Sequence, residues 1–304
     1  MAAVPAPARA LTGAAFATLL LIALMMGANH VAARIAFNNG VDVATAVVFR
    51  SGVTALVIVA LLRSQGVQVR FSRRHKQVLP AIGLLVGIQS LCLYSAVARL
   101  PVALALLAFN TYPIWTAMWS FALYRQRPEK PMLVAMPVIL VGLALALDVF
   151  GAASGLGASG QWAHIGAGVA FALTAAATFG LALVLTQQEA GDVDGRVRTA
   201  TTMGIAGLVA LAMVASQGGF HLPTAPAGWG GLAALTFLYG SGITILFTVL
   251  PRLGVVGNSA IMNVEPVFAL VLAWLILGQS IAAIQVAGAL LVVGAVITLG
   301  LRKK

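Results

Sequence analysis

The chain has 304 residues, of which 61% are hydrophobic and only 8% are charged. A soluble domain usually has about 45–50% apolar and about 25% charged residues, so this composition excludes a soluble protein and indicates a lipid environment. The net charge of +11 does not indicate nucleic-acid binding, because the basic residues lie in short segments between long apolar runs.

Ten apolar runs are long enough to predict membrane-spanning helices, which need about 20 residues each. Helices are expected because lipid satisfies no backbone hydrogen bonds, and the strict alternation of a membrane barrel is missing from the sequence. The first run follows Arg9 like a signal peptide, but no small-residue cleavage site follows it, so we interpret it as a retained span. In chain order the predicted spans are 11–33, 41–62, 77–97, 101–123, 131–150, 164–186, 199–216, 229–249, 255–277 and 281–301.

The positive charges between the spans predict their orientation. If the N-terminus is cytoplasmic, 15 of the 18 Lys and Arg residues lie in cytoplasmic segments. The opposite side then has only Arg34 and Arg99, while Arg50 lies inside the second span. Because cytoplasmic loops of membrane proteins carry an excess of Lys and Arg, we expect both termini in the cytoplasm.

The second half of the sequence repeats the first at a spacing of 153 residues. Arg, Asn and Pro are scarce in membrane spans, so their matches are informative. The matched pairs are Gly13 and Gly166, Gly27 and Gly180, Gly87 and Gly240, Tyr94 and Phe247, Arg99-Leu100 and Arg252-Leu253, Asn110 and Asn263, Pro113 and Pro266, and Trp115 and Phe268.

These matches predict two repeats, 1–150 and 161–304, joined by a flexible Gly/Ser-rich linker at 151–160. Each repeat has five predicted spans, and an odd number makes the second repeat enter the membrane from the opposite side. The fold class is therefore an all-α membrane protein with two inverted five-helix repeats, a construction found in many secondary transporters.

Four segments carry a resemblance to a known family. They are Gly27-Ala28-Asn29-His30-Val31-Ala32-Ala33-Arg34 in the first span, Phe49-Arg50 in the second, Pro101-Val102-Ala103 through Pro113 in the fourth, and Asn263-Val264-Glu265-Pro266-Val267-Phe268 in the ninth. Their order and spacing resemble the ten-helix EamA-type carriers of the drug/metabolite transporter superfamily, most of all the YddG-type amino-acid exporters. The resemblance implies export of amino acids or related metabolites across a bacterial inner membrane.

Two features depart from the family pattern. Met26 stands where members often have Trp. The fourth and ninth spans end in Leu123-Tyr124-Arg125 and Leu277-Gly278-Gln279, where members often have Leu-Gly-Glu. The missing carboxylates put any role of that Glu in doubt.

Two charges inside the predicted spans are the first candidate site residues. Glu265 is the only acidic residue near the middle of a span, where a charge costs about 2.5–3.5 kcal/mol on insertion scales. We expect Glu265 either to bind a substrate ammonium or proton, or to be a hydrogen-bonded helix-packing group. Arg50 either holds a substrate carboxylate, pairs with Glu265, or braces helix carbonyls, and the brace is the favoured interpretation.

The remaining candidates are prolines, small residues, amides and aromatic residues of the spans. Pro113 and Pro266 are expected to kink their helices and free the carbonyls of Phe109 and Met262. The stripe of Tyr112, Trp115 and Trp119 predicts either a pocket wall or core packing. Asn110 and Asn263 are expected to bond between helices, with pocket contact as the alternative. Further candidates are Gly27 and Gly180 as hinges, Tyr94, Gln89, Asn258 and Tyr239 as binding residues, and His30 as a packing residue near the outer surface.

The function that follows is an alternating-access secondary transporter that exports small amphipathic metabolites, chiefly amino acids, including aromatic and apolar ones. The alternative keeps the fold and takes cationic drugs or polyamines as substrates. An enzyme would need a clustered catalytic set, which the four scattered histidines do not provide, and a channel would lack counterflow. We expect no cofactor, no metal site and no nucleic-acid partner; the partners are a small-molecule substrate and the bilayer, and homodimerisation is left open.

Overall fold

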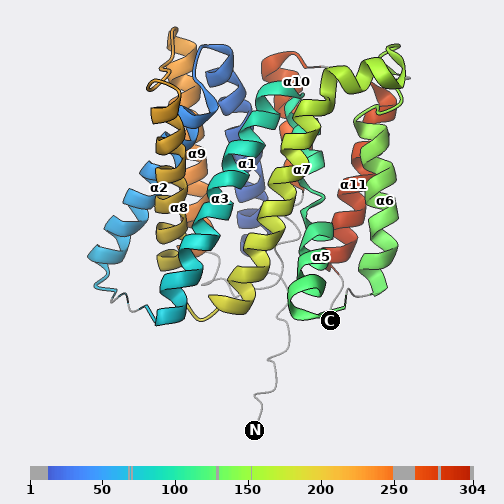
Figure 1. The fold of residues 1–304 in the computed structure, drawn as a ribbon. Coiled ribbons are helices and arrows are strands. Elements are labelled where there is room, and N and C mark those ends of the chain that lie inside the picture. Colours follow the sequence, from blue (N-terminus) through green and yellow to red (C-terminus); the bar gives the residue numbers. More distant parts are fainter. Residues whose placement is uncertain are drawn as a thin grey trace.

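The computed structural model describes residues 13–67, 69, 71–127, 130–151, 153–248, 264–279 and 282–301. All regular structure in these ranges is helical, and Figure 1 shows the helices as one bundle. The helices are α1 (Gly13–Asn38), α2 (Val43–Ser64), α3 (Arg73–Arg99), α4 (Val102–Phe109), α5 (Tyr112–Tyr124), α6 (Lys130–Ala146), α7 (Gly157–Glu189), α8 (Gly195–Ser216), α9 (Pro226–Thr248), α10 (Glu265–Leu277) and α11 (Ala283–Leu301).

The length and surface of these helices suit a bilayer. Within the described residues, six helical stretches are long and apolar enough to cross a membrane, and three shorter ones are also apolar. Large apolar side chains such as Leu56, Val134 and Phe237 point outward and are about 70% exposed, which only lipid makes favourable. The protein is therefore a multi-pass membrane protein, while the number of ten spans stays a prediction because residues 249–263 lie outside the described part.

Polar side chains fix where some spans begin. The Asp42 carboxylate precedes α2 and accepts a hydrogen bond from the Thr45 backbone N–H at 2.6 Å. The Asp194 carboxylate precedes α8 and accepts one from the Arg196 backbone N–H at 2.8 Å. Such caps satisfy N–H groups that the first turn of a helix leaves without a partner.

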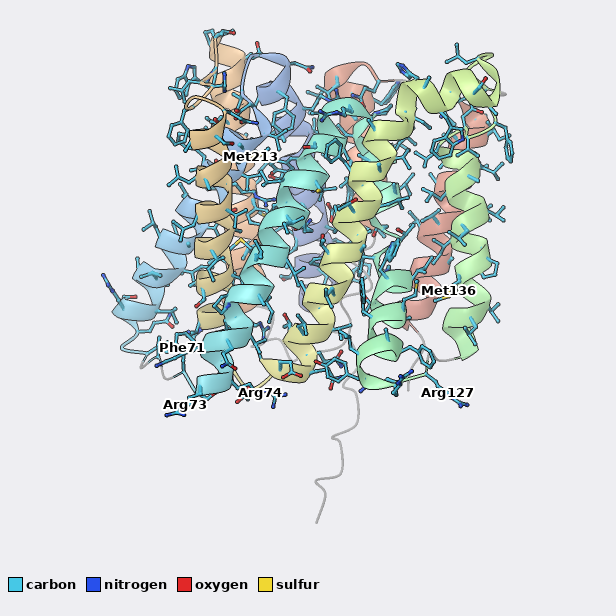
Figure 2. The ribbon with its side chains drawn as sticks, in the orientation of Figure 1. Phe71, Arg73, Arg74, Arg127, Met136 and Met213 are labelled. Carbon is cyan, nitrogen blue, oxygen red and sulfur yellow. The ribbon has the colours of Figure 1, made fainter. Side chains whose placement is uncertain are left out.

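Basic side chains gather at one end of the bundle. Figure 2 shows Arg73, Arg74 and Arg127 at the same end, with Met213 toward the other end. The sequence predicts that the segments containing these three arginines lie on one side of the membrane, and the structure agrees for these residues.

The closest helix packing joins the first half of the chain to the second. α1 packs against α9 and α10, α3 against α7 and α8, α2 against α8 and α9, α5 against α7, and α6 against α11. At two of these crossings a glycine admits the partner backbone. A Cβ at Gly27 would lie 3.1 Å from the backbone nitrogen of Ala269, and a Cβ at Gly180 only 2.8 Å from that of Thr116.

The two glycines predicted as hinges both have a packing role in this structure. α1 is continuous through Gly27 and α7 is continuous through Gly180. Because each glycine faces a partner backbone within van der Waals range, its small size serves a close helix crossing.

The fourth predicted span, 101–123, matches one apolar stretch, Val102–Tyr124, that is interrupted by a short break. α4 ends at Phe109 and α5 begins at Tyr112, with a short break between them. Pro113 lies in the first turn of α5, where its missing N–H leaves no intrahelical bond unmade. The helix is thus interrupted just before Pro113, where the sequence predicts a kink, and the proline begins the second segment. Pro266 has the same position in the first turn of α10.

The linker expected at 151–160 is only partly irregular, because α7 begins at Gly157. Figure 1 shows the first turns of α7 lying across one end of the bundle before the helix enters it. The preceding turn is tied by the Asp148 carboxylate, which accepts hydrogen bonds from the backbone N–H groups of Ala153 and Ser154 at 3.0 and 2.8 Å. A hydrogen-bonded turn and a helix start thus occupy part of the predicted linker.

Candidate functional site

A cluster of polar side chains lies inside the bundle, where α1, α2, α3, α5, α9 and α10 come together. Asn29 and Tyr94 are fully buried, while Arg50 is 3% and His30 5% exposed. Each polar group buried at this depth in lipid needs a partner or a function. We call this set the central polar cluster; its members are Asn29, His30, Arg50, Gln89, Ser90, Tyr94, Tyr112, Tyr239 and Glu265.

The anionic part of the cluster is a pair between α1 and α10. His30 Nε2 lies 3.3 Å from Glu265 Oε1, with 6% of the His30 and 22% of the Glu265 side chain exposed. His30 is three residues after Gly27, so both face α10 at the crossing that the glycine permits. Glu265 is in the first turn of α10, where the helix dipole favours a negative charge.

This pairing changes two expectations from the sequence. The sequence predicts that His30 is a packing residue, yet its Nε2 contacts the Glu265 carboxylate. Arg50 is not that partner, because its contacts are elsewhere. Tyr112 of α5 interacts electrostatically with Glu265 and completes this part of the cluster.

The cationic part of the cluster is Arg50, which points into the space between α2, α3 and α9. Its Nη2 donates a hydrogen bond to Ser90 Oγ at 2.6 Å. Its Cζ lies 4.0 Å from the ring centre of Tyr239 and 4.7 Å from that of Tyr94, a cation–π arrangement with both rings. Arg50 Nε is buried and has no hydrogen-bond partner among the described residues.

Tyr94 connects the cationic and anionic parts. Its hydroxyl donates to Asn29 Oδ1 at 2.9 Å, and its ring meets the His30 ring edge-on at 5.7 Å between centres. Arg50 lies over the same Tyr94 ring. Tyr94 therefore has the buried cation on one side and the His30–Glu265 pair on another.

Several predicted site residues lie outside this cluster. The Asn110 side chain donates to the Leu106 carbonyl of its own helix at 2.8 Å, so this expected bond between helices is within α4. Trp119 Nε1 donates to the Ala177 carbonyl of α7 at 3.0 Å, and the Trp115 Cβ lies against Gly180 of α7. The aromatic stripe of α5 thus packs against α7 through its two tryptophans.

Tyr112, the third member of that stripe, lies between α7 and the cluster. Its ring packs against Phe109 and Phe179, with ring centres 5.7 and 5.2 Å apart. Asn258 and Asn263 lie outside the described residues.

The sequence does not predict one polar contact between the two halves of the chain. Gln279, which stands where the family often has Glu, accepts a hydrogen bond from the Val102 backbone N–H at 3.1 Å. Val102 is the first residue of α4, so Gln279 caps the start of a helix in the other half of the chain. The departure from the Leu-Gly-Glu pattern was the only signal, and the amide oxygen keeps the acceptor that the carboxylate would have provided.

Side-chain pairs tie the two halves of the chain together at both ends of the bundle. At the end where α2 begins, His221 Nδ1 lies 2.9 Å from Asp42 Oδ2, and the Thr224 backbone N–H donates to the Asn39 carbonyl at 2.9 Å. An open depression of about 450 Å³ lies beside this tie and includes no residue of the central polar cluster.

The opposite end has a second set of pairs. His75 Nε2 lies 3.1 Å from Asp192 Oδ1, and Arg74 forms an ion pair with Glu189. The part of the chain that the structure describes contains no group of His, Cys, Asp or Glu residues suited to hold a metal ion.

Comparison with known proteins places this site in a transporter. The EamA-like transporter family matches the chain twice, at residues 13–147 and 166–301. The threonine/homoserine exporters RhtA of two Salmonella typhimurium strains, SL1344 and LT2, are each 24% identical over 247 residues, which is 78% of this chain and 75% of the exporter. A solved crystal structure shares the fold, with a TM-score of 0.60, 19% identity, and coverage of 93% of this chain and 95% of the other. Because the two family matches cover most of the sequence, the chain belongs to the EamA-like transporter family and is a transporter, not an enzyme.

Proposed function

We propose that the protein is a secondary transporter that exports amino acids across a bacterial inner membrane. The observation that carries this proposal is the central polar cluster, which holds a carboxylate and a guanidinium inside the bundle without pairing them to each other. Intramembrane charges are costly and usually mark a substrate or ion path. An amino acid brings one charge of each sign and so complements such a site.

The chemistry of the cluster suits the ammonium end of an amino acid. Glu265 offers a carboxylate acceptor whose side chain is partly accessible, at 22% exposure. The rings of Tyr112 and Tyr239, which are both partly exposed, offer apolar surface for a side chain. Two relatives named as threonine/homoserine exporters support amino acids as the solute class.

Alternating access follows from the repeat. The two family matches begin at residues 13 and 166, the spacing of 153 that the sequence repeat also has. We propose ten spans in two inverted repeats, with the Asp42–His221 tie on the outer face and the His75–Asp192 tie on the cytoplasmic face. Both ties are closed in this structure, and each would open in turn to release solute on its own side.

Cationic drugs and polyamines are the competing substrates. A polyamine carries several positive charges and favours several carboxylates, yet Glu265 is the carboxylate of the cluster and Arg50 adds a buried positive charge. The cluster therefore favours a zwitterion over a polycation.

Counterflow in proteoliposomes tests the proposal. Vesicles loaded with unlabelled threonine or phenylalanine are expected to accumulate the labelled amino acid, and spermidine loading is expected to have no effect. Glu265→Gln should reduce this exchange by at least about tenfold, because a hydrogen bond to a charged group contributes about 1.5–3 kcal/mol.

Asp194→Asn is the matched control, because it removes a carboxylate outside the cluster and Asn caps helices as well as Asp does. Normal exchange in Glu265→Gln would remove Glu265 from the mechanism. Exchange of spermidine without exchange of amino acids would replace the proposed substrate class with the alternative.

A further inference from the structure

Arg50 has hydrogen-bonding capacity that its surroundings do not use. A guanidinium carries five N–H donors, and only 3% of the Arg50 surface is exposed. Its described partners are the Ser90 hydroxyl and two tyrosine rings, all of them neutral. The ion pairs among the described residues do not include Arg50, and its Nε is buried without a partner. A buried cation of this kind is costly unless an anion joins it.

Arg34 shows what a bracing arginine looks like in the same molecule. Its Nη1 donates to the Ala98 carbonyl at 3.0 Å and its Nη2 donates to the Leu100 carbonyl. These carbonyls are at the C-terminal end of α3, where the helix dipole favours a cation. Arg50 has no such setting, because it lies within α2 and its charge faces rings and a hydroxyl. The sequence favours a bracing role for Arg50, but in the structure Arg34 has that role.

The repeat shows that the packing does not require a charge at this position. The residue 153 positions after Arg50 is Met203, which lies in α8 as Arg50 lies in α2. Met203 accepts a weak hydrogen bond from the Tyr239 hydroxyl, at 3.4 Å to the sulfur. The same scaffold position is therefore filled by an apolar side chain in the other half of the chain.

We propose that Arg50 binds the carboxylate of the transported solute, so that a free carboxylate is a requirement for recognition. A planar guanidinium matches a carboxylate with two parallel hydrogen bonds, and the two tyrosine rings hold the guanidinium in place. A monoanion suits the site better than a phosphate dianion, because Glu265 already adds a negative charge to the same cluster.

This proposal rests on the proposed function, and it adds the recognition of the second charge of the amino acid. Tyr94 links the two charges, because its ring contacts both Arg50 and His30, and His30 in turn contacts Glu265. The two charged ends of one solute are thereby assigned to two separate subsites.

The test measures ligand binding by the purified full-length protein in nanodiscs, from the ligand-dependent rise in its unfolding temperature. Two ligand series have the side chains of threonine and phenylalanine. Each series contains the amino acid, its amide, and the corresponding acid without the amine. The wild type is expected to bind the carboxylate-bearing ligands more tightly than the amide.

In Arg50→Gln we expect the affinity for the amino acid to fall about tenfold to a hundredfold, with the affinity for the amide unchanged. Arg50→Lys keeps the charge without the planar fork and should keep part of the preference for the carboxylate. Arg34→Gln is the matched control: it should lower the unfolding temperature and leave the ratio of acid to amide affinity as in the wild type.

Equal losses for the acid and the amide in Arg50→Gln, or no preference for the acid in the wild type, would overturn the proposal. If Arg50→Gln does not fold, the acid-to-amide ratio of Arg50→Lys decides, and an unchanged ratio counts against the subsite. If amino acids neither bind nor exchange but the amine-free acids stabilise the wild type and not the variant, the proposed function fails and the subsite stands.

Discussion

The two halves of this transporter have similar helix positions and crossings but differ in their buried polar residues. α5 and α10 are each 13 residues long and start 153 positions apart, with a proline in the first turn. Each is crossed by a helix from the other half at a glycine, Gly180 for α5 and Gly27 for α10. Both end in a residue with left-handed backbone, Arg125 with φ 56° and Gly278 with φ 65°.

Most polar groups of the central cluster do not follow this repeat. The first half supplies seven of the nine members; Tyr112 corresponds to Glu265, and the other six have an apolar residue 153 positions later. These pairs are Asn29 and Ala182, His30 and Leu183, Arg50 and Met203, Gln89 and Gly242, Ser90 and Ile243, and Tyr94 and Phe247. The repeat thus provides the helix crossings, and most of the polar cluster lies where one copy departs from the other.

The largest expected effect concerns the two glycine crossings. A Cβ at Gly180 would lie 2.8 Å from the Thr116 backbone nitrogen, closer than a Cβ normally comes to any atom, while at Gly27 the nearest atoms are at 3.1 Å. Overpacking at such contacts costs about 1–3 kcal/mol. We expect Gly180→Ala to lower the unfolding temperature in detergent more than Gly27→Ala does.

Gly204→Ala is the control for this pair, because a Cβ there meets no atom within 4 Å. In an open helix position alanine is favoured over glycine by about 0.5–1 kcal/mol, so this variant should be slightly stabilised. Equal losses at Gly27 and Gly180, or a loss at Gly204, would show that the crossings do not control the packing.

A smaller effect is expected at the ends of α5 and α10. Left-handed backbone costs an L-residue about 1–2 kcal/mol, and glycine is largely free of this cost. Arg125→Gly should therefore stabilise the protein and Gly278→Arg should destabilise it, each by about 1 kcal/mol. Arg125→Ala keeps the positive φ and removes the charge, so stabilisation in that variant would assign the effect to charge and not to the backbone.

The positions of the helices were well predicted from the sequence, because the length of each apolar run and the charges beside it are local properties of the segment. It placed most of the described helices within a few residues and found the 153-residue spacing. The sequence predicts a disruption at Pro113 but does not distinguish a kink from a break, because a proline has the same sequence signature at the start of a helix as inside one.

The composition of the site was only partly predictable. Glu265, Arg50 and Tyr94 stand out as polar residues in spans, yet their partners depend on which helices cross. The His30–Glu265 pair joins residues 235 positions apart, and no periodicity in the sequence encodes such a contact. The Gln279 cap of α4 was unpredictable for the same reason, since it joins residues from the two halves of the chain.

The smallest expected effect separates the helix caps Asp42 and Asp194. The Arg196 guanidinium donates hydrogen bonds to the Asp194 carboxylate and holds the pKa of Asp194 below its usual range. The contribution of Asp194 to stability is therefore present above its ordinary pKa of about 4 and is lost as the pH falls through the lower pKa of the folded state.

We accordingly expect Asp194→Ala to cost no more than about 1 kcal/mol at neutral pH, because the pair is partly exposed to solvent. Unfolding measured at several pH values should show the difference from wild type shrinking below about pH 4. Asp42→Ala loses both its cap and its tie to His221 in the other half of the chain, so its effect should also appear in the exchange rate. The opposite result would be a change in exchange rate from Asp194→Ala and none from Asp42→Ala. It would show that transport depends on the cap at the start of α8 and not on the Asp42–His221 contact.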